Sequence, residues 1–386
     1  MRDEIDADLG DLLKRRLATI GSIDQLAGMK PAELAPRLLP WYQKERRDLP
    51  WRSTRDPYAI WVSEIMLQQT TVRTVIPFYE RFLNRFPTVM DLAASPLDEV
   101  LKRWAGLGYY RRARQLHAAS RVVVERFSGR FPDRLDDVLS LPGVGRYTAG
   151  AIMSIAFEAR VPLVDGNVSR VFSRVFAIDT PVDEARTQAR LWDIAEQAVP
   201  ERSPGDFNQA LMELGATVCH PTSPDCARCP LKDPCQARAQ SRQHEWPRKK
   251  GKVEATAVGL HVFLAGNPSE VLLIKRPESG ILAGLWEPPT IENPPFETPA
   301  SAISRLAEHG IRLQNPVSIG SARHAIMNFR IRLDIFQAQL VSFPPKTASG
   351  IENRLVARGE VHELGLSAVG RKSLERFFAA SEKDAL

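Results

Sequence analysis

The chain has 386 residues, of which 44% are hydrophobic and 25% are charged, and its formal net charge is +6 at pH 7. At about 150 residues per domain this length indicates two to three domains with sizeable cores, which excludes a small disulfide-stapled scaffold. The composition excludes wholesale disorder, and the absence of a run of about 18 apolar residues excludes a membrane-spanning protein. A pI near 9.2 favours a polyanionic partner, but only weakly.

The amino-terminal half of the chain has a helical pattern. Residues 1–33 form an extension, which we expect to be helical and for which the sequence suggests no purpose. They begin without the apolar stretch of a secretory signal, so we expect a cytoplasmic protein, associated with the nucleoid if it is bacterial. From 34 to 240 apolar residues recur every three or four positions and turns are marked by Pro and Gly, which predicts an all-α domain. The helices expected within it cover 58–82 (one or two helices), 97–104, which Ser95 caps with Pro96 in the first turn, and 111–127.

A basic segment separates this domain from a second one. Residues 241–254 are polar, basic and broken by Pro247, which is typical of a linker, and a solvated connector or a phosphate contact are equally good interpretations. Residues 255–386 have the pattern of an α+β domain. The expected elements are strands over 255–263 and 270–275 around a hairpin at Gly266-Asn267-Pro268, a helix over 298–309 that ends at Gly310, and extended segments over 311–313, 317–320 and 328–340.

All four cysteines lie within 17 residues, at Cys219, Cys226, Cys229 and Cys235. A reducing compartment disfavours disulfides, and four thiolates suit either zinc or an iron-sulfur cluster. The intervals of six, two and five residues resemble the 4Fe-4S loop of the endonuclease III and adenine glycosylase superfamily. This resemblance implies a structural cluster held by the four cysteines.

The segment from Leu141 to Thr148 contains Gly143 and Gly145 between two helical stretches. These glycines permit a tight turn that exposes backbone N–H groups at the start of the next helix, where phosphate binds well. The segment resembles a helix-hairpin-helix motif, which grips DNA without reading its sequence. We therefore expect a DNA-binding protein.

Two acidic residues are candidates for chemistry. Glu64 lies in a largely apolar stretch, and burial there would raise its pKa and keep it protonated near neutrality. Asp165 precedes Gly166 and Asn167 and would stay charged if backbone donors near the hairpin cap it; each of the two could equally be structural. One acid and one anion are what the cleavage of a glycosidic bond requires.

In combination, these motifs resemble the MutY family of adenine DNA glycosylases from about residue 34 to the carboxyl terminus. The segments that carry the resemblance are Leu49-Pro50-Trp51-Arg52, Arg55-Asp56-Pro57-Tyr58, Ser63 to Thr70, the Gly106 to Tyr110 turn and Val164 to Asn167. The resemblance implies Glu64 as the catalytic acid, with Asp165 as the second carboxylate and Asn167 beside it. It implies a role for Tyr147 in the pocket, at the position where bifunctional relatives have a lysine nucleophile. Because a phenol cannot form a Schiff base, we expect hydrolysis without strand cleavage.

The same resemblance implies contacts to DNA. Arg52 and Gln209 would line an adenine pocket, and Gln69, Thr70, Leu107 and Tyr109 would wedge into the duplex or contact the lesion base, with Leu107 and Tyr109 as core residues in the alternative. Gly143 and Gly145 would contact the backbone. The partner would be double-stranded DNA that carries adenine opposite 8-oxoguanine or guanine, bound by a monomer.

The second domain resembles the Nudix-like recognition domain of this family. The hydrolase glutamates are reduced to Glu308, so we expect a binding module. Many relatives have Phe-Ser-His in the loop that contacts 8-oxoguanine, where this chain has Ile326-Met327-Asn328. Asn328 can donate and accept hydrogen bonds but Met327 cannot replace the serine, which makes lesion discrimination weaker or shifts it toward Thr70, Leu107 and His324. His324 could equally be a strand residue with satisfied hydrogen bonds.

The sequence leaves two rival functions open. One is a bifunctional glycosylase for oxidised pyrimidines, against which the missing lysine and the extra domain argue. The other is a non-catalytic DNA-binding scaffold stabilised by its metal site, in which Glu64 and Asp165 are structural.

Overall fold

The computed structural model forms two compact units, each assembled from two separated stretches of chain. The residues described are 29–251, 254–267, 269–277, 282–292, 298–326, 328–347, 350–361 and 364–383. The first unit combines the described part of Met1–Arg47 with Met153–Lys250, and the second combines Asp48–Ile152 with Gly251–Leu386. Most of the expected helical extension over 1–33 lies outside the described residues.

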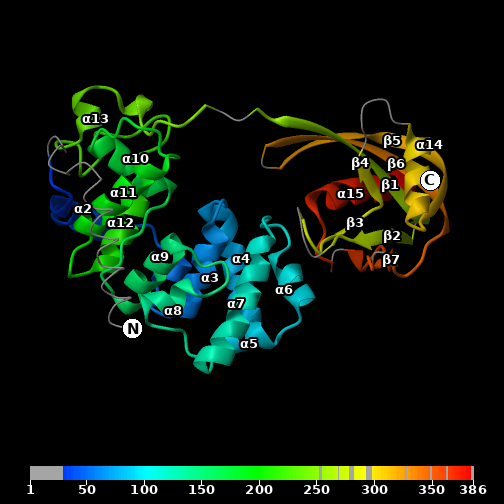
Figure 1. The fold of residues 1–386 in the computed structure, drawn as a ribbon, viewed down its shortest axis with the longest axis horizontal. Helices are drawn as coiled ribbons and strands as arrows, with labels where there is room; N and C mark the ends of the chain where they lie inside the picture. The colour runs from blue at the N-terminus through cyan, green and yellow to red at the C-terminus, as the bar shows by residue number, and fades with distance from the viewer. Residues whose placement is uncertain are drawn as a thin grey trace, which may run out of the picture. The chain divides into compact units, whose positions relative to one another are not determined.

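The first unit consists of helices. They are η2 (Pro31–Glu33), α2 (Leu34–Glu45), the end of α9 (Arg146–Phe157), α10 (Gly166–Val175), α11 (Ala185–Ala198), α12 (Pro204–Thr217), α13 (Gln236–Ala239) and η4 (Gln243–Glu245). Helix α12 contacts both α2 and α10 (Figure 1). Fully buried apolar side chains such as Leu38, Phe172 and Phe207 form this core. Because α12 is central, residues on it are held from two sides.

The helices of the second unit match the sequence pattern closely. They are η3 (Pro50–Arg52), α3 (Pro57–Leu67), α4 (Val72–Arg85), α5 (Val89–Ala94), α6 (Leu97–Trp104), α7 (Arg111–Phe127), α8 (Leu135–Leu139) and the start of α9. The all-α class is confirmed, and the stretch 58–82 is two helices. The N-cap prediction was wrong by one residue: Pro96 occupies the N-cap of α6, while the Ser95 hydroxyl donates to the Asp91 carbonyl, 2.8 Å away.

The α+β part of the second unit is confirmed as a sheet with a helix on each face (Figure 1). Its described strands are β1 (Thr256–Asn267), β2 (Glu270–Lys275), β3 (Trp286–Glu287), β4 (Thr290–Glu292), β5 (Arg312–Ile326), β6 (Phe329–Ser342) and β7 (Asn353–Ala357). The main order is β3-β2-β1-β6-β5, with β1 and β6 parallel. Residues of α15 (Ala368–Lys383) pack on one face of the sheet and residues of α14 (Pro299–Glu308) on the other.

Strand β5 differs from the expectation of two short extended segments. It is one strand of 15 residues, whose register against β6 shifts at three places, between Arg312 and Gly320. From Gly320 to Ile326 the pairing with β6 is regular and antiparallel. The bulges explain why the alternation in the sequence looked interrupted.

The expected linker is partly ordered against the first unit. Trp246 is buried, and its carbonyl accepts a hydrogen bond of 3.0 Å from the Arg174 guanidinium of α10. Arg248 forms an ion pair of 2.7 Å with Asp179. The segment around these residues is therefore packed, rather than being a free connector.

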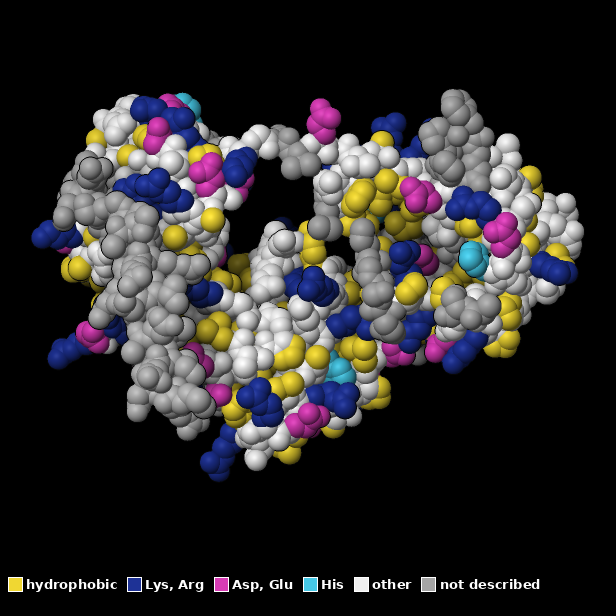
Figure 2. All heavy atoms as spheres, in the orientation of Figure 1, with side chains coloured by type: hydrophobic (Ala, Val, Ile, Leu, Met, Phe, Trp, Pro, Cys, Tyr) yellow, Lys and Arg dark blue, Asp and Glu magenta, His cyan; other side chains and the backbone are white. Residues whose placement is uncertain are grey.

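Surface charge gives little guidance to function. On the face shown in Figure 2, Lys and Arg side chains are spread over both units and interleaved with acidic ones. No helix in the described part of the chain is long and apolar enough to cross a bilayer.

Candidate active site

Glu64 lies on α3, a helix that is buried on all sides. Asp56 caps this helix by accepting the N–H groups of Tyr58 and Ala59, both at 3.2 Å, and Pro57 occupies its first turn. Every residue from Tyr58 to Met66 is buried, and Glu64 is only 4% exposed. The sequence therefore places a carboxyl group in an apolar interior, away from bulk water.

Tyr147 is a hydrogen-bond partner of Glu64. It lies in the first turn of α9, and its phenol donates to Glu64 Oε2 over 2.5 Å. One turn after Glu64, at the C-cap of α3, the Gln68 amide donates to the Thr148 hydroxyl over 3.3 Å. The start of α9 is thus attached to α3 beside the acid, and the position of the relatives' lysine is occupied by a hydrogen-bond donor.

The turn before α9 has the geometry of a hairpin between two helices. Helix α8 ends at Leu139, the Val144 N–H donates to the Leu141 carbonyl over 3.1 Å, and α9 begins at Arg146. Gly143 has a φ of 76°, and a Cβ there would lie 2.6 Å from Gln115 Cβ. Gly143 is therefore required by both conformation and space. Gly143 and Gly145 are exposed, which leaves the backbone of the turn accessible.

Two exposed loops of the second unit are joined by one buried arginine, which the sequence analysis missed. Arg112 donates to the carbonyls of Ile65, Met66 and Gln68 at 2.6 to 2.8 Å, at the carboxyl end of α3. Its other terminal nitrogen reaches the Leu107 and Gly108 carbonyls and the Thr70 hydroxyl at 3.2 to 3.3 Å. Burial lowers the pKa of Arg112 to about 10. The arginine satisfies backbone acceptors of both loops and fixes them as a pair.

These two loops carry the residues expected to wedge into DNA. Gln69 is exposed with a φ of 56°, and Thr70 is half-buried. Tyr109 is 50% exposed with a φ of 49°, whereas Leu107 is only 5% exposed. Tyr109 thus presents a free aromatic surface, and the burial of Leu107 favours the core alternative for that residue.

Asp165 is the N-cap of α10 in the first unit. It accepts the Val168 N–H at 2.7 Å and the Asn167 amide at 2.9 Å. Burial raises the pKa of Asp165, while these two donors and the charge of Arg170 oppose the rise. The capping donors come from α10 itself and not from the hairpin, which corrects the sequence-based expectation.

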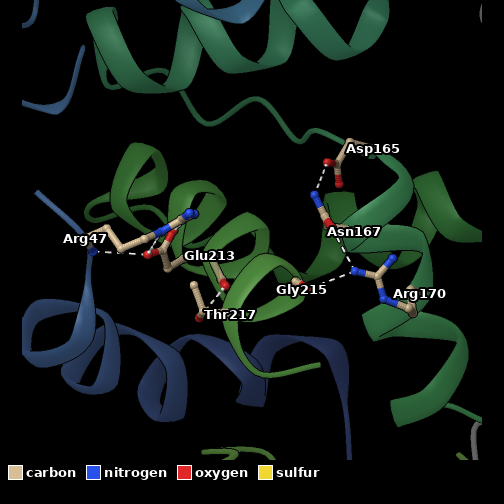
Figure 3. Close-up of polar contacts among 7 residues, drawn as sticks. All are labelled: Arg47, Asp165, Asn167, Arg170, Glu213, Gly215 and Thr217. Atoms are coloured by element: carbon tan, nitrogen blue, oxygen red, sulfur yellow. Dashed lines mark hydrogen bonds and ion pairs between the residues drawn. The ribbon is translucent and has the colours of Figure 1, made fainter. Parts of the chain in front are cut away.

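A chain of hydrogen bonds runs from Asp165 to a cysteine of the Cys219–Cys235 loop. Arg170 donates over 2.8 Å to Asn167 Oδ1 and over 2.7 Å to the Gly215 carbonyl (Figure 3). It also donates over 2.7 Å to the Cys219 carbonyl. A Cβ at Gly215 would lie 2.5 Å from Asn167 Cβ. The orientation of Asn167, and through it that of Asp165, therefore depends on α12 and on this loop.

The two residues expected to line the adenine pocket are both half-buried. Arg52 ends η3 in the second unit, and Gln209 lies on α12 in the first. Near Gln209 on the same helix, the fully buried Glu213 accepts a bidentate pair from Arg47, with distances of 2.8 and 2.7 Å (Figure 3). This ion pair raises the pKa of Arg47. It attaches the end of α2 to α12 and was not predicted.

The four cysteines line one cavity between α10, α12 and α13. Each is partly buried, and the enclosed space of the cavity is about 20 Å³. Among the described residues, no group of three or more His, Cys, Asp or Glu side chains is arranged to hold a metal ion. The donor set itself, four thiols around one cavity, is of the type that a 4Fe-4S cluster or a zinc ion uses.

The surroundings of the cysteines also favour a charged sulfur centre. Arg174 is 2% exposed and donates to Cys219 Sγ over 3.2 Å, and to the carbonyls of His220 and Pro221. Burial raises the pKa of Cys229 to about 12. A thiolate centre at these cysteines would give the buried Arg174 guanidinium a counter-charge.

Comparison with known proteins identifies the family. Residues 62–197 match the family described as HhH-GPD superfamily base excision DNA repair protein, and residues 261–376 match the NUDIX domain. The chain is 39% identical to the adenine DNA glycosylase of Mus musculus over 371 residues, which cover 81% of this chain and 71% of the relative. The chain belongs to the adenine DNA glycosylase family.

Two further adenine DNA glycosylases support this assignment. The chain is 35% identical to the adenine DNA glycosylase of Homo sapiens, with 87% of this chain and 72% of the relative covered. It is 33% identical to that of Buchnera aphidicola subsp. Schizaphis graminum, with 88% of this chain and 97% of the relative covered. The family relationship thus extends over both the helical region and the NUDIX region.

In the NUDIX region, the residues that we expected to contact the lesion lie around the turn between β5 and β6. His324 is a half-buried residue of β5, and burial together with Lys372 lowers its pKa. Asn328 is exposed, and its carbonyl accepts the Thr256 N–H at 2.8 Å. Met327, between them, lies outside the described residues. Glu308, the remaining glutamate of the hydrolase pattern, is exposed at the end of α14.

One signal in the sequence could have revealed Arg112. Arg112, Leu116, Ser120 and Val123 recur at helical spacing on the buried face of α7. An arginine at a core position of an amphipathic helix indicates a buried set of acceptors. No comparable local signal exists for Arg170 or Glu213, because their partners lie far away in the sequence.

Proposed function

We propose that this chain hydrolyses the N-glycosidic bond of adenine mispaired with 8-oxoguanine or guanine in duplex DNA, and leaves an abasic site. Family membership makes the chain a DNA glycosylase of base excision repair and DNA its partner. The single observation that supports hydrolysis best is the buried Glu64 carboxyl, which accepts a hydrogen bond from Tyr147 at the position of the relatives' lysine.

Glu64 acts first as an acid. It donates a proton to N7 of the extruded adenine, the C1′–N9 bond breaks, and the electron pair leaves with the neutral base. Glu64 then accepts a proton from the water that adds to C1′. Tyr147 holds the carboxyl group in one orientation through its 2.5 Å hydrogen bond.

Asp165 acts as the anion that offsets the positive charge of the sugar. Its ionised form is supported by the Val168 N–H and the Asn167 amide, which oppose the rise in pKa that burial causes. A fixed carboxylate of this kind stabilises an oxocarbenium-like transition state. Asn167 keeps it in place.

The remaining residues bind the substrate. Arg52 and Gln209 contact the extruded adenine, and the exposed turn at Gly143 and Gly145 binds the DNA backbone. Gln69, Thr70 and Tyr109 occupy the gap left in the duplex, supported by the exposure of Tyr109. His324 and Asn328 contact the base opposite the adenine.

We further propose a 4Fe-4S cluster held by Cys219, Cys226, Cys229 and Cys235. When bound, it would supply structural rigidity to the loop that Arg170 and Arg174 contact. The proposal also includes a catalytic domain over 34–240, a linker over 241–254, a recognition domain over 255–386, a monomeric state and a cytoplasmic location.

A duplex assay tests the function. End-labelled duplexes with adenine opposite 8-oxoguanine, adenine opposite guanine, and thymine opposite 8-oxoguanine are incubated with the full chain and split into two portions. We expect strand breaks in the two adenine duplexes only after treatment with hot alkali. Breaks before alkali would indicate a bifunctional glycosylase, and binding without any base release would indicate a scaffold. Absorption near ~400 nm would distinguish an iron-sulfur cluster from colourless zinc.

A further inference from the structure

The hairpin of β5 and β6 extends beyond the helix that covers one face of its sheet (Figure 1). Near α14, the covered face is apolar, and Phe336 and Ala338 of β6 are buried there. Nearer the turn, the same face carries Asp334, Arg332 and Arg330 in alternate positions. The face therefore changes from a packed core to an exposed surface along a single strand.

Three arginines lie together on this exposed part. In the regular register of the hairpin, Arg323 is directly opposite Arg332, and Ala325 is opposite Arg330, so Arg323, Arg330 and Arg332 share one face. All three are exposed. We call these three residues the arginine face.

The neighbouring strand leaves the arginine face open. On the parallel strand β1, Ala257 pairs with Arg330 and Gly259 with Arg332. Ala257 and Gly259 have side chains too short to cover the guanidinium groups of Arg330 and Arg332. The opposite face of the hairpin, which includes His324, is the one toward α15 and its core. The arginine face is thus distinct from the side that carries His324.

The charges of the arginine face are mostly unbalanced within the protein. Like charges directly opposite each other across two strands destabilise a sheet. Arg332 forms an ion pair of 3.1 Å with Asp334, whereas Arg323 and Arg330 have no ion-pair partner among the described residues. An unbalanced cluster of exposed arginines at the end of a hairpin matches a polyanion better than a protein core.

We propose that the arginine face binds phosphates of the DNA backbone next to the Ile326–Asn328 turn. The inference rests on the proposed function, which supplies a duplex as the partner, and it adds a contact that the expected lesion residues do not include. Arginine forks match phosphate oxygens in geometry and charge. Because the contact is to the backbone, it supplies affinity and position independently of the lesion.

The experiment compares the full chain with R323Q/R330Q, which removes the two unpaired charges. Anisotropy titrations use two labelled duplexes, one undamaged and one with a non-hydrolysable adenine analogue opposite 8-oxoguanine. The salt concentration is varied from about 50 to about 200 mM, a range over which affinity from phosphate contacts changes strongly. Each lost phosphate contact lowers the salt slope by about 0.9 and weakens binding at 0.1 M salt by roughly eightfold. We expect both duplexes to bind at least about tenfold more weakly, with a shallower salt dependence.

Two further variants make the result specific. R312Q/K346Q removes two exposed charges of the same region away from the turn and should bind like the unmodified chain. R323K/R330K keeps the charges and should retain most of the affinity. An unchanged melting temperature of R323Q/R330Q shows that this variant is folded. If its melting temperature falls, the test is the affinity of R323K/R330K, which should stay close to that of the unmodified chain.

Several outcomes would overturn the inference. Unchanged DNA affinity in R323Q/R330Q would do so, as would an equal loss of affinity in R312Q/K346Q. A loss of affinity confined to the lesion duplex would also contradict a backbone contact. Displacement of DNA by free dGTP at matched ionic strength would indicate a nucleotide site instead. Failure of the proposed function is distinguishable, because it would appear as absent base release by the unmodified chain while DNA binding still depended on the arginine face.

Discussion

The two candidate carboxylates are held in opposite ways. Glu64 lies within a buried helix, where it accepts a hydrogen bond from the Tyr147 phenol and has apolar residues around it. Asp165 is at the beginning of a helix, where a backbone N–H, an amide and a nearby arginine all favour the ionised form. The comparison teaches that two carboxyl groups of one protein can stand in very different surroundings, one inside an apolar helix and one at a helix start with several donors.

The largest effect is expected from Glu64→Gln. The amide keeps the shape but cannot transfer a proton, so the single-turnover rate of base release should fall by about 10³ to 10⁴. DNA affinity should remain within about threefold of the unmodified chain, since no charge contact to the backbone is lost. A rate within tenfold of the unmodified chain would contradict the role of Glu64 as the acid.

Asp165→Asn should lower the same rate by about 10² to 10³, because it removes the anion but leaves the cap largely intact. The pH profile of the unmodified chain gives a second measurement. Burial raises the pKa of Asp165, so the active anion is lost as the pH falls through a value above the ordinary aspartate value of about 3.9. The acid limb of the profile should disappear in the variant; an unchanged limb would assign it to another group.

Arg170→Met tests whether the hydrogen bonds of Arg170 orient Asp165 and favour its ionised form. Loss of the guanidinium removes a positive charge that lowers the pKa of Asp165, so the acid limb should move to higher pH, and the rate at its optimum should fall by about tenfold. Arg186→Met, at an exposed position of α11, is the matched control. An equal change in both variants, or a rate loss without movement of the limb, would indicate a purely structural role for Arg170.

Tyr147→Phe should have the smallest effect. It removes one neutral hydrogen bond to Glu64, worth about 0.5 to 1.5 kcal/mol, so base release should slow by roughly two- to tenfold. If the rate instead fell as far as in Glu64→Gln, Tyr147 would take part in proton transfer. Tyr147→Lys sharpens the comparison further, because strand breaks before alkali treatment would show that this position selects the reaction class.

The sequence predicted the local parts of the molecule well. Helices at 97–104 and 111–127 follow from apolar spacing, and the turn at Gly143 follows from its composition, since these signals need only neighbouring residues. Glu64 was found because its own neighbours are apolar, and Asp165 because Gly and Asn follow it. The burial of Glu64 and the N-cap position of Asp165 are therefore encoded locally.

What the sequence did not reveal depends on distant partners. Arg47 and Glu213 are 166 positions apart, and Arg170 reaches Cys219 across 49 positions. No periodicity marks such pairs, because either residue alone looks like an ordinary surface charge. The single strand β5 was divided for a related reason, since its bulges shift the alternation that a sequence pattern relies on.

The closeness of Gly215 to Asn167 limits which residues position 215 of this protein can accept. Even the methyl group of alanine at position 215 would stand 2.5 Å from Asn167 Cβ, so any larger residue must push the asparagine aside. The same methyl group would stand 3.0 Å from Asn167 Cα, so the backbone of α10 would have to shift against α12 as well. Substitution at position 215 would therefore weaken the packing of two helices and move Asn167 at the same time.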